Sequence, residues 1–501
     1  MRRVAFLFAI LALSALSFAI GTTVRRPRPA GPPAIVTARV PGIVLVCVDT
    51  LRADGVEADA VSDGLPSVRA FAQRATSFSD AIAPSAWTLP SVASLLTGLH
   101  LTTHGVLELS ADARLAGAVP TLASQLKRAG FSTAACTGGG WVSPENGLGT
   151  GFDRFHVDFD RRPPSQAIVR FAKETEPNRP FFLFLHTYGA HDPYGDKTPM
   201  FTGPCPDPDP SLTVSLTVSL TESLADAVSA RRPLVGELRH RFIRAVLGDP
   251  CAHATLLAGL GHTNASNLWL EDCRGWADGG WRDEPGGPAT CEALRVAYRR
   301  GLAATDRRLG ELLEALDAFP PETVVILTGD HGEAFGEHGV VHHGRYLFHE
   351  LVHVPLLVRA PGFPAGTVVP GPCSLVDVVP TCLELAGITS APASDGTSLF
   401  AAAMGAPTAR TVRSTVAPGD AVAGGVERLR RRTSVRDANL AWIGTLDLPS
   451  MAWVEEVWFD RRDGVEAPRT TPPTPTPAFL EEVARARLAL ETPYRARAAG
   501  R

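Results

Sequence analysis

The chain has 501 residues, 45% of them hydrophobic and 20% charged, which is the composition of a globular protein with a large core. At this length we expect about two to four domains. The formal net charge of −4 gives no electrostatic reason to expect nucleic acid as a partner, and we expect none.

The first 20 residues have the pattern of an export signal. Two arginines precede the apolar run "VAFLFAILALSALSFAI", and the small residues Ser17 and Ala19 stand near its end. We therefore expect export to the periplasm or the extracellular space. An uncleaved membrane anchor is the alternative, because residues 4–20 are nearly long enough to cross a bilayer. A Pro-rich linker, residues 21–42, follows this segment.

Strand and helix patterns alternate from residue 43 onwards. Helical patterns such as "LPSVASLLTG" separate the apolar runs. This alternation predicts an α/β domain over residues 43–365, with a mostly parallel central sheet covered on both faces. Four apolar runs predict its buried parallel strands: residues 43–48, 132–136, 181–185 and 323–327.

Residues 203–288 differ in composition from the rest, and we expect an insertion there that forms a lid or a substrate wall. Within it, leucines recur every four residues between 212 and 224, which predicts a helix with a drifting apolar stripe. A smaller unit is expected over residues 366–468. Residues 469–501 then read as a Pro/Thr linker and an amphipathic tail helix.

The chain has 8 cysteines, and an exported protein is able to pair them. Cys47 and Cys136 lie in strand-like runs, so we expect them to be small buried side chains. The better candidates for disulfides cluster in one irregular region: Cys205, Cys251, Cys273 and Cys291.

Polar residues follow three of the predicted strands. Asp49 follows the first, His186 and then His191 follow the third, and Asp330-His331 follows the fourth. Ligands of open α/β sheets bind outside the carboxyl ends of the strands. Together with the segment around Thr88, four separated stretches are therefore expected to converge on one site.

The residue types in these stretches suit one divalent metal ion. Asp49, Thr88, Asp330 and His331 offer two carboxylates, a hydroxyl and an imidazole, and Ca²⁺, Mg²⁺, Mn²⁺ and Zn²⁺ each accept subsets of such ligands. A metal there would lower the pKa of the Thr88 hydroxyl and make it a nucleophile. The alternative for Thr88 is a helix N-cap.

These segments resemble the sulfatase family, within the alkaline phosphatase superfamily. The resemblance runs from about residue 42 to residue 388. It rests on "VLVCVDTLRAD", "PSVASLLTGLHLTTHGV", "PFFLFLHTYGAHDPY" and "TVVILTGDHGEAFGEHG". It implies an alkaline-phosphatase-like sandwich with a metal at the strand ends, a small C-terminal α+β subdomain, and hydrolysis of an anionic ester. By its position in "HDPY", His191 is implied to protonate the leaving group.

The chain departs from the family pattern at the nucleophile. Family sulfatases carry Cys or Ser in Cys/Ser-x-Pro-Ser-Arg and convert that residue to formylglycine, whereas here Thr88 and Val92 stand at the first and last positions. The Lys and His of the family pattern Gly-Lys-Trp-His are absent from "TGGGW" (137–141). Asp49 stands alone where many sulfatases have two adjacent Asp.

A Lys expected after "DHG" is also missing. His343 is the candidate to replace it at a substrate oxygen, and Arg345 is a weaker candidate. The alternative for His342 and His343 is a solvated loop.

A plain threonine ester favours phosphorus chemistry. Formylglycine hydrate releases sulfate by elimination through its second hydroxyl, whereas a Thr88 ester must be hydrolysed at the central atom, which suits phosphorus better than sulfur. We therefore expect hydrolysis of phosphomonoesters or phosphodiesters of a small molecule, glycan or lipid. A true sulfatase, a phosphoryl-group transferase and a non-catalytic family member are the alternatives.

Overall fold

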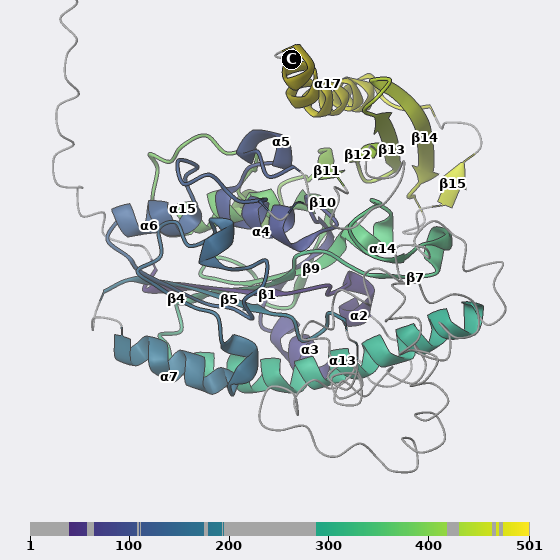
Figure 1. Ribbon diagram of the computed structural model, residues 1–501. Helices are drawn as coiled ribbons and strands as arrows, with labels where there is room; N and C mark the ends of the chain where they lie inside the picture. The colour runs from purple at the N-terminus through teal and green to yellow at the C-terminus, as the bar shows by residue number, and fades with distance from the viewer. Residues whose placement is uncertain are drawn as a thin grey trace, which may run out of the picture. The chain divides into compact units, whose positions relative to one another are not determined.

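A mixed eight-stranded sheet forms the centre of the computed structural model (Figure 1). The structure describes residues 40–57, 65–107, 110, 112–174, 179–192, 194, 287–417, 430–462, 467–469 and 474–499. The strand order is β10-β2-β9-β6-β1-β5-β3-β4. The strands are β1 (Gly42–Val48), β2 (Thr76–Ile82), β3 (Ser132–Cys136), β4 (Arg154–His156), β5 (Phe181–Thr187), β6 (Val324–Gly329), β9 (His353–Arg359) and β10 (Thr367–Ser374).

The four apolar runs predicted as strands are β1, β3, β5 and β6. They pair with one another in parallel, β1 with β5 and β6, and β3 with β5. Only β9 runs antiparallel to its neighbours β2 and β6, so the sheet is mostly parallel, as expected. Successive side chains of β1 enter two different cores. Ile43 and Leu45 belong to one apolar cluster, and Val44 and Val46 belong to the other.

Helices cover both faces of this sheet (Figure 1). One face carries α4 (Thr88–Thr97), α6 (Leu122–Arg128) and α15 (Val378–Leu385). The opposite face carries α3 (Pro66–Ala72), α7 (Pro164–Glu174) and α13 (Gly287–Leu316). The shorter elements are α2 (Ala53–Glu57), α5 (Leu101–His104), α14 (His349–Val352), α16 (Phe400–Ala403), β7 (Ala334–Phe335) and β8 (Val341–His342).

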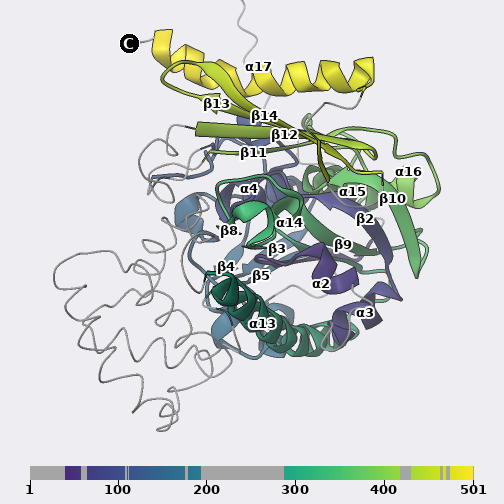
Figure 2. The same ribbon diagram turned by 90° about the vertical axis from the view of Figure 1, so that its right-hand side faces the viewer.

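A second, antiparallel sheet follows in the C-terminal part of the chain, where the tail helix α17 (Pro477–Ala499) packs against β12 (Figure 2). Phe479 of α17 is fully buried against Val435 and Trp442 of this sheet. The strands, in their order across the sheet, are β11 (Val412–Val416), β12 (Arg430–Arg436), β13 (Leu440–Asp447), β14 (Ala452–Asp460) and β15 (Ala467–Arg469).

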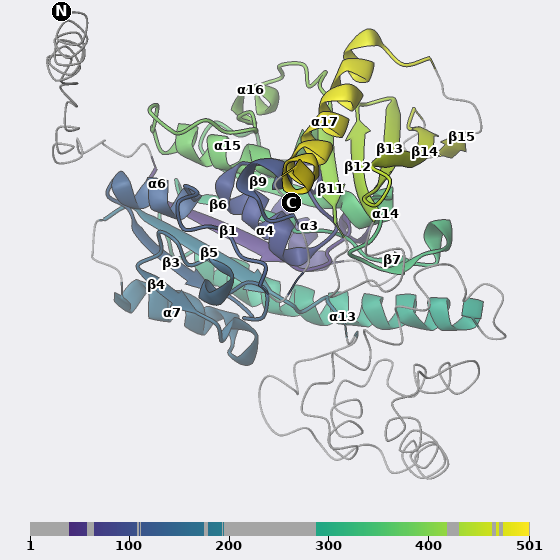
Figure 3. The ribbon, with the colours of Figure 1, turned by 45° about the horizontal axis from the view of Figure 1, so that its top comes forward.

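The boundary between the two sheets differs from the one expected near residue 366. Strand β10 pairs with β2 inside the central sheet, and α15 packs on α4 (Figure 3). The smaller sheet therefore starts only at Val412. The expected export segment, residues 21–39 of the expected Pro-rich linker and nearly all of the insertion 203–288 lie outside the described residues. Gly42, the last residue of that linker, is already the first residue of β1.

The cysteines confirm that two of the predicted strand residues are buried. Cys47 and Cys136 are buried, as predicted. In the part of the chain that the structure describes, Cys291 is a free buried thiol, which lies on α13 among the apolar side chains that cover the sheet. The other three predicted disulfide cysteines lie outside the described residues. Among the residues that are described, none of the helices has the length and apolar character needed to span a membrane.

Candidate active site

The ends of three adjacent strands bring the first site residues together. Asp49 follows β1, His186 lies near the end of β5, and Asp330 follows β6. Strands β5 and β6 both pair with β1 in parallel, with Cys47 opposite His186 and Val48 opposite Gly329. The three side chains therefore leave the sheet at the same edge, which is where ligands bind in open α/β sheets.

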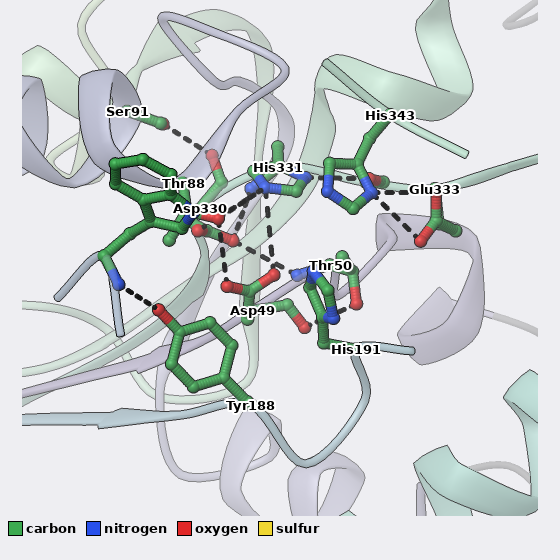
Figure 4. Close-up of polar contacts among 12 residues, drawn as sticks. Asp49, Thr50, Thr88, Ser91, Tyr188, His191, Asp330, His331, Glu333 and His343 are labelled. Carbon is green, nitrogen blue, oxygen red and sulfur yellow. Dashed lines mark hydrogen bonds and ion pairs between the residues drawn. The ribbon is translucent and has the colours of Figure 1, made fainter. Parts of the chain in front are cut away.

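Asp49, His186 and Asp330 form a buried group with the spacing of a metal site. One ligand atom from each lies within 4.8 Å of the other two. Nε2 of His331 lies 3.7 Å from Oδ1 of Asp49 and 3.7 Å from Oδ2 of Asp330 (Figure 4). Two carboxylates and two imidazoles thus face one point, and such a donor set suits a divalent cation.

Some of the potential metal-ligating atoms of this group make no hydrogen bond to the described residues. Oδ1 of Asp330 accepts N–H groups of Thr50 and His331, at 3.1 and 2.8 Å. Its Oδ2 and both ring nitrogens of His186 are buried without a hydrogen-bond partner among the described residues. Buried polar atoms without partners are costly, and a bound cation would remove that cost. The residues present therefore fit a metal ion.

Burial also sets the protonation of these groups. It raises the pKa of Asp330 to about 7, and the nearby Asp49 carboxylate adds to this shift. Burial lowers the pKa of His186 to about 3 and that of His331 to about 4. Nδ1 of His331 lies 2.9 Å from the carbonyl of Gly332 and donates to it, so the lone pair of Nε2 faces the site.

His186 was not among the metal ligands predicted from the sequence, although it directly follows the "FFLFL" run. It supplies a ligand atom within 4.8 Å of those of Asp49 and Asp330. Thr50 directly follows Asp49, at the position where many sulfatases have a second Asp. It has φ 57°, and its hydroxyl donates to the backbone carbonyl of Asp49. The Thr50 hydroxyl is therefore engaged by the backbone.

Thr88 is the first residue of α4, and its side chain is only 1% exposed. Its hydroxyl donates to Oδ2 of Asp49 at 3.2 Å and lies 3.4 Å from Nε2 of His331 (Figure 4). The N-cap position belongs to Trp87, and the helix has no side-chain cap. The alternative of a capping role for Thr88 is therefore wrong, because its hydroxyl contacts site residues.

The first turn of α4 is tied to the end of β6. The hydroxyl of Ser91 donates to the backbone carbonyl of Asp330 at 2.6 Å. This bond holds the N-terminus of the helix against the metal-site residues. Because α4 has no side-chain cap, the free N–H groups of this turn are available to an anionic group.

Aromatic side chains line the site beside Thr88. Trp87 lies edge-on to Trp141, with ring centroids 6.4 Å apart. The phenol of Tyr188 accepts the backbone N–H of Trp141 at 3.1 Å and donates to the carbonyl of Gly139 at 3.2 Å. This is the "TGGGW" segment, which lacks the family's Lys and His. Trp141 of this segment is therefore held beside Trp87 by the phenol of Tyr188.

Two further histidines predicted from the sequence lie beside this group. Nδ1 of His191 lies 2.6 Å from Oδ1 of Asp192. The ring of His343 lies 5.1 Å from that of His191 and 4.5 Å from that of His331. The side chain of His343 is only 6% exposed, so the alternative of a solvated loop is wrong.

Glu333, which the sequence reading did not single out, is a fully buried partner of this group. Its two carboxylate oxygens lie 3.0 and 3.1 Å from Nδ1 of His343 (Figure 4). Arg345, the weaker candidate, is a buried side chain whose backbone carbonyl accepts an N–H of Arg432 at 2.9 Å.

Known proteins match both the sequence and the fold. The sulfatase family model matches residues 41–388, which is more than half of the chain. Arylsulfatase K of Mus musculus is 41% identical over 109 residues, which are 21% of this chain and 20% of that protein. Arylsulfatase K of Homo sapiens is 40% identical over 97 residues, 19% of this chain and 18% of that protein. The matched segment therefore spans about a fifth of the length of these curated relatives.

Solved structures share the fold at low sequence identity. A phosphonate monoester hydrolase from Silicibacter pomeroyi has a TM-score of 0.55 and 21% identity, over 91% of this chain and 95% of that chain. A protein solved in complex with its substrate D-glucosamine-2-N,6-O-disulfate has a TM-score of 0.59 and 16% identity, over 85% of this chain and 92% of that one. Given its fold, its strand-end site and the extent of the family match, the chain belongs to the sulfatase family.

Proposed function

We propose that this sulfatase-family protein is a metal-dependent hydrolase of anionic esters, in which Thr88 forms a covalent intermediate. The observation that carries the proposal is the position of the Thr88 hydroxyl, which is buried 3.2 Å from Asp49 and 3.4 Å from His331. A threonine hydroxyl held among buried carboxylates and neutral imidazoles matches the arrangement of an activated nucleophile.

Asp49, His186, Asp330 and His331 would hold a divalent cation, which would supply the Lewis acidity that makes the Thr88 hydroxyl nucleophilic. The Thr88 hydroxyl gives its proton to Oδ2 of Asp49, to which it donates at 3.2 Å, and Oγ1 attacks the phosphorus or sulfur atom of the ester. The bond from that atom to the leaving oxygen breaks. His191, oriented through Nδ1 by Asp192, gives its proton to that oxygen. Water then hydrolyses the Thr88 ester.

We propose that phosphomonoesters or phosphodiesters are the preferred substrates. Threonine has one hydroxyl, so its ester leaves only by attack of water at the central atom, and phosphorus accepts such attack more readily than sulfur. Sulfuric ester hydrolysis is the second candidate, supported by the family match and by the arylsulfatase relatives. We propose that residues outside the metal site recognise the small molecule, glycan or lipid that carries the ester.

The donor set favours Mn²⁺ or Zn²⁺ over Ca²⁺ or Mg²⁺. Two imidazoles face the site beside two carboxylates. Imidazole is a common ligand of transition metals and Zn²⁺, whereas Ca²⁺ and Mg²⁺ prefer oxygen ligands. Metal analysis of the protein purified without chelators checks this, and a stoichiometric content of Ca²⁺ alone would contradict it.

The test of the function uses a matched pair of substrates, 4-nitrophenyl phosphate and 4-nitrophenyl sulfate, with Thr88→Ala as the control. We expect turnover of the phosphate ester to exceed that of the sulfate ester, and Thr88→Ala to abolish both. Sulfate turnover in large excess would establish the second candidate instead. A Thr88→Ala variant as active as the wild type would contradict the role of Thr88.

We also propose that the protein is exported, on the basis of the N-terminal pattern alone. N-terminal sequencing of the protein recovered from the producing cells distinguishes a chain cleaved near Ala19 from an anchored one that retains residues 4–20. A full-length chain found only in the cytoplasm would contradict export.

A further inference from the structure

Glu333 is a fully buried carboxylate that the mechanism above does not use. It lies two residues after His331, in the segment that follows β6. Both of its oxygens accept from Nδ1 of His343, at 3.0 and 3.1 Å. Tyr194, itself 2% exposed, donates its hydroxyl to Oε2 at 2.7 Å. These contacts fix the carboxylate against one edge of the imidazole.

The carboxylate determines which nitrogen of His343 carries the proton. A carboxylate accepts hydrogen bonds, so Nδ1 is the donor and Nε2 of the neutral ring keeps its lone pair. A neutral imidazole of this tautomer is a hydrogen-bond acceptor at Nε2, unlike the cationic Lys that the family has at this place in the sequence.

The free edge of the ring faces the reaction centre. Figure 4 shows Nδ1 of His343 turned to Glu333 and the opposite edge turned towards His331. The ring centroid lies 4.5 Å from that of His331, whose Nε2 is 3.4 Å from the Thr88 hydroxyl. Trp87, the residue before Thr88, lies 5.2 Å from the same ring. The Nε2 edge of His343 therefore faces His331, the residue whose own Nε2 contacts the Thr88 hydroxyl.

We propose, as an inference that rests on the proposed function, that Glu333 is a positioning residue for the second half of the reaction. It holds His343 so that Nε2 accepts a hydrogen bond from the water that hydrolyses the Thr88 ester. The water oxygen bonds to the central atom, the bond from that atom to Oγ1 of Thr88 breaks, and one water proton ends on Oγ1. Formation of the ester does not need this water.

The Glu333→Gln variant tests this inference, because glutamine keeps the shape but its amide donates to Nδ1. That bond puts the ring proton on Nε2 and removes the acceptor. With 4-nitrophenyl phosphate we expect a burst of about one 4-nitrophenol per chain, followed by a steady state slowed roughly 100-fold. Mass spectrometry of the quenched variant should find the phosphoryl group on the peptide that contains Thr88.

Two further variants make the test specific. His343→Ala removes the same acceptor and should accumulate the same adduct. Glu350→Gln is the matched control, since buried Glu350 accepts from Nδ1 of His338 at 3.1 Å in a pair that holds no site residue. It should keep the wild-type steady state without a burst.

The outcomes separate this inference from the proposed function. If Glu333→Gln and His343→Ala slow turnover without a burst or an adduct, Glu333 does not serve the hydrolytic step, while a wild-type activity that Thr88→Ala abolishes still supports the function. Accumulation of the adduct in Glu350→Gln beyond the wild-type level would also overturn the inference. If the wild type has no esterase activity at all, the proposed function fails first.

Discussion

Thr50 connects the two buried carboxylates of the site through a left-handed backbone. Its φ of 57° is unusual for a β-branched residue and costs about 1–2 kcal/mol. The conformation is held from both sides, because the Thr50 N–H donates to Asp330 and the Thr50 carbonyl accepts the hydroxyl of Tyr298 at 2.7 Å. The strained conformation of Thr50 therefore helps to orient the Asp330 carboxylate towards the metal site.

His186 is expected to be a metal ligand, and removing it should weaken metal binding. The His186→Ala variant loses one of the imidazoles that face Asp49 and Asp330, so we expect its affinity for Mn²⁺ or Zn²⁺ to fall at least about tenfold. Titration of the metal-free protein by calorimetry measures this. His156→Ala, which removes an imidazole paired with Glu174 outside the site, serves as the control. Equal affinities in the two variants would show that His186 is not a ligand.

The sequence predicted several residues of the candidate site but not all of them. Asp49, Asp330 and His331 stand directly after apolar strands, so their convergence followed from the pattern. His186 and Glu333 were missed as site residues because their contacts depend on strand register and on a loop that folds back over the site. Neither property can be read from spacing along the chain.

Gly344 allows the loop that carries His343 to pass against Trp87. Its φ is 89°, and a Cβ at this position would overlap the Trp87 ring. We expect Gly344→Ala to lower the free energy of unfolding by about 2–3 kcal/mol and to reduce kcat by moving His343. Urea unfolding and steady-state kinetics on the same preparation measure both effects.

Gly130→Ala is the matched control for that change. Gly130 also has a positive φ, 94°, but nothing lies within 4 Å of a Cβ built there. It should lose only about 1–2 kcal/mol, the cost of the left-handed backbone, and keep wild-type kcat. If both variants behave alike, the contact between Gly344 and Trp87 does not position the loop.

His104 connects α5 to the helix that carries Thr88. Its Nδ1 accepts the N–H of Val106 at 3.1 Å, so the ring proton lies on Nε2, which donates to the hydroxyl of Ser94 at 2.9 Å. Protonation of Nδ1 would break the first of these bonds. Burial lowers the pKa of His104 to about 4, from 6.5 for an exposed histidine.

The stability of the protein should therefore fall in acid through this residue. Between pH 6.5 and about 4 the unfolded state binds the proton and the folded state does not, so the free energy of unfolding falls as the pH drops. His104 alone contributes on the order of 3 kcal/mol across this window. Urea unfolding at several pH values should give His104→Gln a shallower slope than the wild type. Parallel slopes would exclude His104 as the cause.

The elements themselves were largely predictable. The four apolar runs are strands, and α4 begins next to the predicted "LPSVASLLTG" segment, because buried parallel strands and amphipathic helices leave clear patterns. The pairing of β10 with β2 was not predictable from such patterns. It joins segments nearly 300 residues apart, and its outcome depends on the packing of the whole sheet.

At the scale of the whole molecule, the C-terminal sheet holds the loop that carries His343. Buried Arg432 of β12 donates to the backbone carbonyl of Arg345 at 2.9 Å and lies 4.3 Å above the ring of Tyr346. Arg436 of the same strand donates to the backbone carbonyl of Leu347. Two arginines of the smaller sheet thus hydrogen-bond to the backbone of the loop that carries His343.

Arg432→Met should therefore lower activity even though the residue lies outside the site. The change leaves the Arg345 carbonyl without this donor and removes the stacking on Tyr346, for a loss of about 1–3 kcal/mol. We expect kcat to fall at least about fivefold with the metal content unchanged. Arg485→Met, in an exposed part of α17, should alter neither. A normal kcat in Arg432→Met would show that the smaller sheet does not support the site.

The central claim is that Thr88 becomes covalently esterified during turnover, and rapid quenching of the wild-type protein tests it most directly. The protein is mixed with 4-nitrophenyl phosphate or 4-nitrophenyl sulfate, quenched in acid within milliseconds, digested and sequenced by mass spectrometry. We predict a phosphoryl group on Thr88 that forms before the steady state and is absent from Thr88→Ala. Turnover of either ester with no adduct on Thr88 at any quench time, or with an adduct on another residue, would contradict the account.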